Sequence, residues 1–365
     1  MRTSPAPQDA GFRIGTSSSS LTLKTVYTSD LLNSASGTFT ADVNSLSPST
    51  TYYYQAFMTV SDGNGGYTEI VSENIGSFTT SAVASVSPGY LGCYEVPAIS
   101  NLSGTGTNGT NSGRDDKWFR YYTTNSKQQV ATHTFTHPST NEQTRNYTVL
   151  YDESVYAPRW VAYAMHSSTW LDDGSGRSGS WTTDPAINLT QQTGLDNATT
   201  VGYSRGHMVS SQERQSSAGQ NAQTFYYTNQ APQWQNGFNG GIWSTLEQKI
   251  VANAPSGLDT LYVVTGVLYE SDTKLPSGSL SVTIPSHFYK CLMKCTFNTS
   301  GTMTAASGIA YLYTNESHTG VNYYDSQFVT TIDAIETRTG YDFFPDVPSS
   351  LQTSAESTAT ALWTY

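Results

Sequence analysis

The chain has 365 residues, which is long enough for two domains that each bury a core. Its formal net charge is −11 at pH 7, and this acidity argues against tight binding of nucleic acid, which depends on lysine and arginine neutralising phosphates. No apolar run approaches the length of a membrane span, and the first residues show no apolar core of a secretory signal. Only 12% of the residues are charged while 25 are tyrosine, a composition that favours a β-rich extracellular protein.

Residues 1–80 are predicted to form short strands and turns. Residues 51–58 alternate small and large side chains, as a strand does, and a turn-forming cluster over 61–66 follows. The segments 46–54 and 76–80 resemble fibronectin type III-like domains of bacterial surface proteins. That resemblance implies a small all-β sandwich, and such a module is expected to contact a surface or a glycan.

A domain boundary is predicted directly after this module. Residues 81–88 are predicted to be a linker, and residues 89–365 a second domain. The Gly-, Asn- and Ser-rich run over 101–113 is predicted to be a flexible surface loop. Further elements follow from apolar periodicity: strands over 115–122, 129–135 and 261–266, and a helix over 240–252.

The segment from 203 to 247 concentrates residues suited to cutting a phosphodiester. His207 has the ordinary pKa of a group that can activate water, and the neighbouring Arg205 can stabilise a charged transition state. The side-chain carbonyl of Asn239 suits a hard cation such as Mg²⁺, which keeps most of its waters. Glu247 follows Asn239 by eight positions, about 80° around a helix, so both can face one site. A base, a cation, a neutral metal ligand and an acid thus occur together.

The order and spacing of these residues resemble the DNA/RNA non-specific endonuclease family, the sugar-non-specific nucleases with a ββα-metal finger. The motif stands here as Ser204–Arg205–Gly206–His207, then Asn229 to Gln233, then Asn239 to Glu247. Further similarity is found over 159–163, 181–186, 284–290 and 332–345, so the resemblance covers residues 90 to 365. It implies an α+β fold in which a central antiparallel sheet is flanked by helices, with DNA and RNA as substrates.

The resemblance also implies a role for each residue of the motif. His207 would be the general base, and Asn229 and Arg205 would orient the phosphate and stabilise its developing charge. Asn239 would bind one Mg²⁺ directly, and Glu247 would hold the ion through water. Mn²⁺ is expected to substitute for Mg²⁺.

Three positions depart from the family pattern. Ser204 stands in place of an aspartate, and Val251 in place of an arginine one turn after the glutamate. Gly179 also stands where the family has an arginine, and Arg177 is a candidate substitute two positions away. The departures and the acidic charge leave an alternative open: a weak or inactive nuclease-fold protein that serves in surface binding or adhesion. The retained motif favours the enzyme.

The cysteines and the composition bear on location. Cys291 and Cys295 lie four positions apart in a predicted strand, about 13 Å at strand rise, and cannot bridge each other there. In an oxidising compartment a bridge from Cys93 to one of them is expected, with three thiols as the alternative. We expect a secreted, periplasmic or cell-surface protein.

Overall fold

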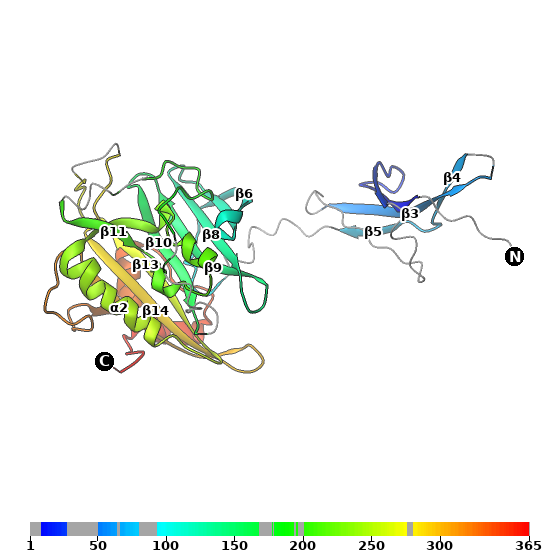
Figure 1. Ribbon diagram of the computed structural model, residues 1–365. Coiled ribbons are helices and arrows are strands. Elements are labelled where there is room, and N and C mark those ends of the chain that lie inside the picture. Colours follow the sequence, from blue (N-terminus) through cyan, green and yellow to red (C-terminus); the bar gives the residue numbers. More distant parts are fainter. Residues whose placement is uncertain are drawn as a thin grey trace. The chain divides into compact units, whose positions relative to one another are not determined.

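The computed structural model of the chain describes residues 9–27, 50–63, 66–79, 93–167, 177, 179–192, 195, 201–275 and 280–364. The chain divides into two compact units, Met1–Ser87 and Pro88–Tyr365 (Figure 1). The predicted linker over 81–88 lies outside the described residues. Within the described residues, no helix is both long enough and apolar enough to cross a membrane.

The first unit is built from one antiparallel sheet over the described residues. Its strands are β1 (Asp9–Gly15), β2 (Leu23–Tyr27), β3 (Thr51–Ser61), β4 (Tyr67–Val71) and β5 (Gly76–Thr79). They run in the order β2–β1–β3–β4, and β5 also pairs with β3. Tyr52 and Phe57 on β3 are buried with Ile14 on β1. The described strands supply no second sheet, and residues 28–49 lie outside the description, so the fibronectin-like sandwich stays a prediction.

The second unit is organised around a nine-stranded antiparallel sheet, as an α+β fold with a central antiparallel sheet requires. The strand order is β16–β15–β14–β13–β10–β9–β8–β7–β6. The strands are β6 (Leu102–Asn111), β7 (Asp116–Thr123), β8 (Gln128–Thr136), β9 (Gln143–Asp152), β10 (Ala157–Met165), β13 (Asp259–Leu268), β14 (His287–Phe297), β15 (Met303–Thr314) and β16 (Val329–Thr330).

Helices cover the central strands because these strands are apolar on both faces. Val263 and Val264 are consecutive on β13, so their side chains lie on opposite faces of the sheet, and both are fully buried. Helix α2 (Ser244–Ala252) packs Leu246 and Ile250 into the same core, and Figure 1 shows it lying over β13 and β14. Helices α3 (Ile332–Thr339) and α4 (Ser349–Ser357) contact β15. The short helix α1 (Ala218–Gln223) contacts β7 and β8.

The predicted surface loop over 101–113 is instead the edge strand β6. Two of its three glycines, Gly106 and Gly109, allow close packing against the paired strand. A Cβ at Gly109 would lie 2.3 Å from the ring of Trp118 on the paired strand β7, and one at Gly106 would lie 3.1 Å from the ring of Tyr121. Glycine in a strand marks a place where a neighbour approaches closely, and here large aromatic rings approach from β7. The Gly-, Asn- and Ser-rich composition suggested a loop. Composition does not show which strand a segment pairs with, so it could not reveal the packing against β7.

The predicted disulfide does not form, since Cys93, Cys291 and Cys295 all remain thiols. Cys93 Sγ instead accepts a hydrogen bond from Arg145 Nη1 at 2.6 Å. Burial raises the pKa of the Cys93 thiol to about 11, against the opposing charge of Arg145. Cys291 and Cys295 are fully buried in β14, where burial raises the pKa of each thiol above its ordinary value. The alternative of three thiols is the one observed.

Candidate active site around His207

Two short strands place the Arg-Gly-His sequence. Strand β11 (Tyr203–His207) pairs antiparallel with β12 (Gln230–Trp234), and α2 follows them in the chain. Gly206 is required at this point, because a Cβ there would lie 2.5 Å from Cβ of Gln233 on the partner strand. Ser204, which replaces the family aspartate, donates its hydroxyl to the Gln233 carbonyl at 3.2 Å. The serine thus braces β11 against β12 by a cross-strand hydrogen bond.

A pocket of about 230 Å³ collects most of the predicted site. Its lining residues come from position 177, β11, the turn after β11, the segment before α2 and the first turn of α2: Arg177, Arg205, His207, Ser210, Ser211, Gln212, Asn239, Gly240, Ser244 and Glu247. Four of the five predicted site residues are therefore brought together, and Asn229 is not among them.

His207 lies in an aromatic cage at one side of this pocket. Its ring is 4.7 Å from that of Trp181 and 5.1 Å from that of Phe225, measured between centroids. Its Nε2 atom is buried and has no hydrogen-bond partner among the described residues. Burial lowers the pKa of His207 to about 3, and the charges of Arg177 and Arg205 act in the same direction. The imidazole is consequently neutral at pH 7 and can accept a proton.

Asn239 is held by its amide group before α2 begins. Its Nδ2 donates to Gln233 Oε1 at 2.5 Å, so the carbonyl oxygen is the atom left to bind a cation. The predicted helix over 240–252 begins later than expected, at Ser244, after an irregular turn over Gln235–Trp243. Gly241 has φ −132° and ψ −115°, which is not helical. Asn239 and Glu247 therefore reach one pocket through this turn and not along one helical face.

Glu247 lines the pocket from the first turn of α2. Two charged neighbours, Glu213 and Lys290, affect its pKa. Burial and the nearby Glu213 raise the pKa of Glu247 to about 8, while the charge of Lys290 opposes the shift. Lys290 is fully buried and donates to Tyr163 Oη at 3.0 Å, and that hydroxyl donates to the Glu213 carboxylate. A bound divalent cation would favour the ionised form of Glu247.

Asn229 does not line the pocket, although the family resemblance implies that it orients the phosphate. It is fully buried, and its Oδ1 accepts from the amide of Val209 at 2.9 Å. Its Nδ2 donates to the carbonyls of Val209 and Thr224 at 3.0 and 2.8 Å. Both polar atoms of its side chain are thus engaged by backbone groups, at Val209 just after His207 and at Thr224. In this structure Asn229 positions the His207 turn and does not face the pocket where a phosphate could lie.

Two arginines flank the site. One is Arg205 of the motif, and the other is Arg177, the candidate substitute for the family arginine missing at Gly179. Arg205 lies over the Trp181 ring at 5.7 Å, and Arg177 lies over the Phe225 ring at 4.8 Å. Gly179 cannot carry the family arginine, because a Cβ there would lie 2.8 Å from the Phe225 ring and φ is +144°. Arg177 lines the pocket and is therefore the residue placed to supply a second cation there. Val251 does not line the pocket.

Several residues of this site were not singled out from the sequence. Ser210 and Glu213 form a capping box around a short 3₁₀ turn, Ser211–Glu213, that shapes the pocket floor. The Ser-x-x-Glu spacing over 210–213 is a readable signal for such a turn. The buried Lys290 had no comparable signal, because its strand reads as an ordinary apolar run.

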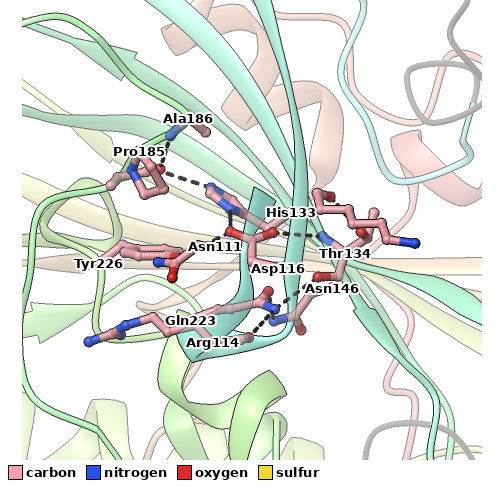
Figure 2. Close-up of polar contacts among 12 residues, drawn as sticks. Asn111, Arg114, Asp116, His133, Thr134, Asn146, Pro185, Ala186, Gln223 and Tyr226 are labelled. Atoms are coloured by element: carbon pink, nitrogen blue, oxygen red, sulfur yellow. Dashed lines mark hydrogen bonds and ion pairs between the residues drawn. The ribbon is translucent and has the colours of Figure 1, made fainter. Parts of the chain in front are cut away.

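A buried polar network anchors the aromatic side of the site to the main sheet (Figure 2). His133 on β8 bonds Asp116 Oδ2 through Nδ1 at 2.9 Å and Asp184 Oδ2 through Nε2 at 3.2 Å, and all three are buried. Asp184 also accepts from the Thr228 hydroxyl, and Asp116 from the Tyr226 hydroxyl at 3.1 Å. The segment that carries Trp181 and the segment that carries Asn229 are thereby tied to β7 and β8.

The sequence matches known nucleases over most of the second unit. The DNA/RNA non-specific endonuclease family matches residues 114–350. A nuclease of Serratia marcescens is 31% identical over 223 residues, covering 58% of this chain and 77% of that protein. The mitochondrial nuclease EXOG of Homo sapiens is 28% identical over 233 residues, covering 60% of this chain and 62% of that protein, which is less than two thirds of its length. A solved structure of an EndoG/EndoGI complex aligns with a TM-score of 0.46 at 24% identity, covering 55% of this chain and 84% of that chain.

Proposed function

This chain belongs to the DNA/RNA non-specific endonuclease family, and we propose that it is a divalent-cation-dependent endonuclease that hydrolyses phosphodiester bonds of DNA and RNA. The observation that carries the proposal is the single pocket lined by His207, Arg205, Asn239 and Glu247. A base, a cation and two oxygen ligands share a cavity of about 230 Å³. The order β11, β12, α2 supports the ββα arrangement that the family resemblance implies.

His207 acts as the general base in this proposal. Its Nε2 atom is buried, has no hydrogen-bond partner among the described residues, and belongs to an imidazole that is neutral at pH 7. It can take the proton of an attacking water. Arg177 and Arg205 disfavour protonation of the free imidazole, and the same two charges stabilise the phosphate as negative charge develops on it. Arrival of the phosphate offsets the arginine charges and so raises the basicity of His207.

The donor set fits a hard divalent cation. The carbonyl oxygen of Asn239 and the carboxylate of Glu247 are oxygen ligands of the kind that Mg²⁺ and Mn²⁺ prefer, and both line the pocket. Asn239 would bind the ion directly and Glu247 through water. When bound, the ion would stabilise negative charge on the leaving 3′ oxygen. Gln233 holds the Asn239 amide in the orientation that this role requires.

The first prediction tests the base. We expect the protein to nick plasmid DNA in Mg²⁺ or Mn²⁺ and to stop in EDTA. His207→Ala is expected to lower the rate roughly 10²- to 10⁴-fold, because proton abstraction is lost while the fold is retained. His166→Ala is the matched control, since His166 lines none of the described pockets and its Nε2 hydrogen-bonds the Gly257 carbonyl at 3.3 Å, away from the His207 site. Near-normal cleavage by His207→Ala would remove the proposed mechanism.

A second function, surface binding or adhesion by a weak or inactive nuclease fold, is supported by Val251 and by the net charge of −11. In that case plasmid DNA in Mg²⁺ stays intact, or is nicked only slowly at the highest enzyme concentrations. A secreted or cell-surface location is proposed from the polar, tyrosine-rich composition, and a surface or glycan contact is proposed for residues 1–80.

A further inference from the structure

A second cavity, of about 580 Å³, adjoins the active-site pocket. Gly240 lines both cavities, and the consecutive α2 residues Ser244 and Thr245 line one each. Asn239, the proposed metal ligand, directly precedes the shared Gly240. A nucleic-acid strand whose scissile phosphate lies at Asn239 must place its neighbouring nucleotide on an adjoining surface. This cavity is such a surface.

Two chain segments form the walls of the cavity and hold each other in place. The Gly237 carbonyl accepts a hydrogen bond from the His318 amide at 3.3 Å. A Cβ at Gly237 would lie 2.4 Å from Ser317 Oγ, so the segments can approach this closely only at a glycine. At Gly241 and Gly320, by contrast, a Cβ would meet nothing within 4 Å. The wall there is bare backbone, which a flat or bulky ligand can approach closely.

An aromatic side chain lies at this cavity on a rigid support. Tyr324 is 36% exposed and is the most exposed aromatic residue among the described residues from 93 onward. It packs edge-on against Tyr323, with ring centroids 5.1 Å apart. The Tyr323 hydroxyl accepts from Trp363 Nε1 at 3.0 Å, and its carbonyl accepts from the Tyr313 hydroxyl at 2.7 Å. A firmly supported, solvent-facing ring is what stacking of a base requires.

The charge at this cavity differs from that of the chain as a whole. The chain has 28 acidic and 17 basic residues, yet none of the residues described as lining the cavity is acidic. Lys249 on α2 adds an exposed cation to the lining. A phosphodiester can therefore approach this surface without facing a carboxylate on it. A surface without carboxylates is uncommon on a chain with this excess of acidic residues.

We propose that this cavity, lined by residues from 237–249 and 318–324, is a subsite for the nucleotide next to the scissile phosphate. The base stacks on Tyr324, and Lys249 contacts a phosphate. The inference rests on the proposed endonuclease function. It adds the position of the nucleotide next to the scissile phosphate in the bound nucleic acid. Its ligand class is a single-stranded nucleotide unit of DNA or RNA, recognised by its flat base and its charge and not by its sequence.

The test compares two substrates in steady-state kinetics. One is a short single-stranded oligodeoxynucleotide, and the other is methyl p-nitrophenyl phosphate, a diester whose only ring is on the leaving group and which carries no base for the subsite. Tyr324→Ala is expected to raise KM for the oligonucleotide roughly 5- to 100-fold, with kcat and small-diester hydrolysis unchanged. Lys249→Gln is expected to raise the same KM and to lower the slope of its salt dependence by about one. Tyr324→Phe, which keeps the ring, should behave as wild type.

Matched controls are available in the same unit. Leu258→Ala removes an exposed apolar side chain, and Lys127→Gln removes an exposed lysine; neither residue lines a described pocket. If wild type cleaves the oligonucleotide and Tyr324→Ala and Lys249→Gln cleave it with unchanged KM, the subsite is overturned and the endonuclease function stands. If wild type cleaves nothing, the proposed function fails, and fluorescence anisotropy of the labelled oligonucleotide decides the subsite. Binding that is lost in Tyr324→Ala and kept in Tyr324→Phe then supports the subsite, and any other result overturns it.

Discussion

At the scale of single residues, the orientation of one amide decides whether a cation can be held. Asn239 can present either its oxygen or its nitrogen to the pocket, and only the oxygen binds a metal ion. Gln233 Oε1 accepts the Asn239 amide hydrogen at 2.5 Å and so selects the productive orientation. The motif predicted both residues, but the sequence could not show that one acts through the other. That relation depends on the irregular turn over Gln235–Trp243, which brings Asn239 back to Gln233 at the end of β12.

Gln233→Leu should therefore weaken metal binding, although Gln233 itself is not a proposed ligand of the metal. We expect the Mg²⁺ concentration for half-maximal nicking to rise about 10- to 100-fold, because supporting hydrogen bonds of metal ligands contribute on that order to affinity. At saturating Mg²⁺ the rate should largely recover. Gln230→Leu is the control, since Gln230 lies on the same strand but donates to the Gln192 carbonyl instead. An unchanged Mg²⁺ requirement in Gln233→Leu would show that Asn239 is oriented by something else.

At the scale of secondary-structure elements, the site depends on how the segments before and after β11 are tied to the main sheet. The Asp116–His133–Asp184 group joins β7 and β8 to the segment next to Trp181. Figure 2 shows its Asp116–His133 contact. Burial alone would lower the pKa of His133, but the charges of Asp184 and Asp116 raise it to about 10. The group is thus a buried cation between two carboxylates. Removing one member of such a group leaves an uncompensated buried charge.

The raised pKa of His133 predicts a pH dependence of stability with a definite sign. Its ordinary value is 6.5 and its folded value is about 10, so its contribution is complete below pH 6.5 and is lost as pH rises through 10. His133→Gln should lower the free energy of unfolding at pH 6 by about 3–5 kcal/mol, and the difference from wild type should shrink toward pH 10. Urea unfolding followed by near-ultraviolet circular dichroism measures this. His166→Gln is the control and should leave the pH profile unchanged, whereas an equal loss for His133→Gln at both pH values would contradict the ion-pair account.

At the scale of the whole molecule, the chemistry belongs to one of two compact units. All residues that line the candidate active site come from the second unit, Pro88–Tyr365. The first unit carries no histidine and only three basic residues over 1–80. Its described strands expose large apolar side chains, including Tyr67 and Ile70 at 59% and 51%. These features support a contact role for the module and not a part in catalysis.

Deletion of residues 1–84 tests this division of labour. The truncated protein should fold, and its kcat/KM on DNA should change by less than about threefold, or ~0.7 kcal/mol. Far-ultraviolet circular dichroism and plasmid nicking are the two measurements. Loss of activity in a truncated protein that keeps its spectrum would show that the module helps to bind substrate. Loss of both would show that the two units share a core.

The sequence by itself determined which residue types meet at the candidate site, because residue type and spacing within a short motif are local properties. His207, Asn239 and Glu247 were predicted as a group, and they line one pocket. Only the tertiary structure decided what depends on segments far apart in the chain. Asn229 hydrogen-bonds the backbone just after His207, the Phe225 ring excludes a side chain at position 179, and Arg177 lines the pocket instead. Partners brought from distant strands are fixed by packing, and packing leaves no periodic signal in the sequence.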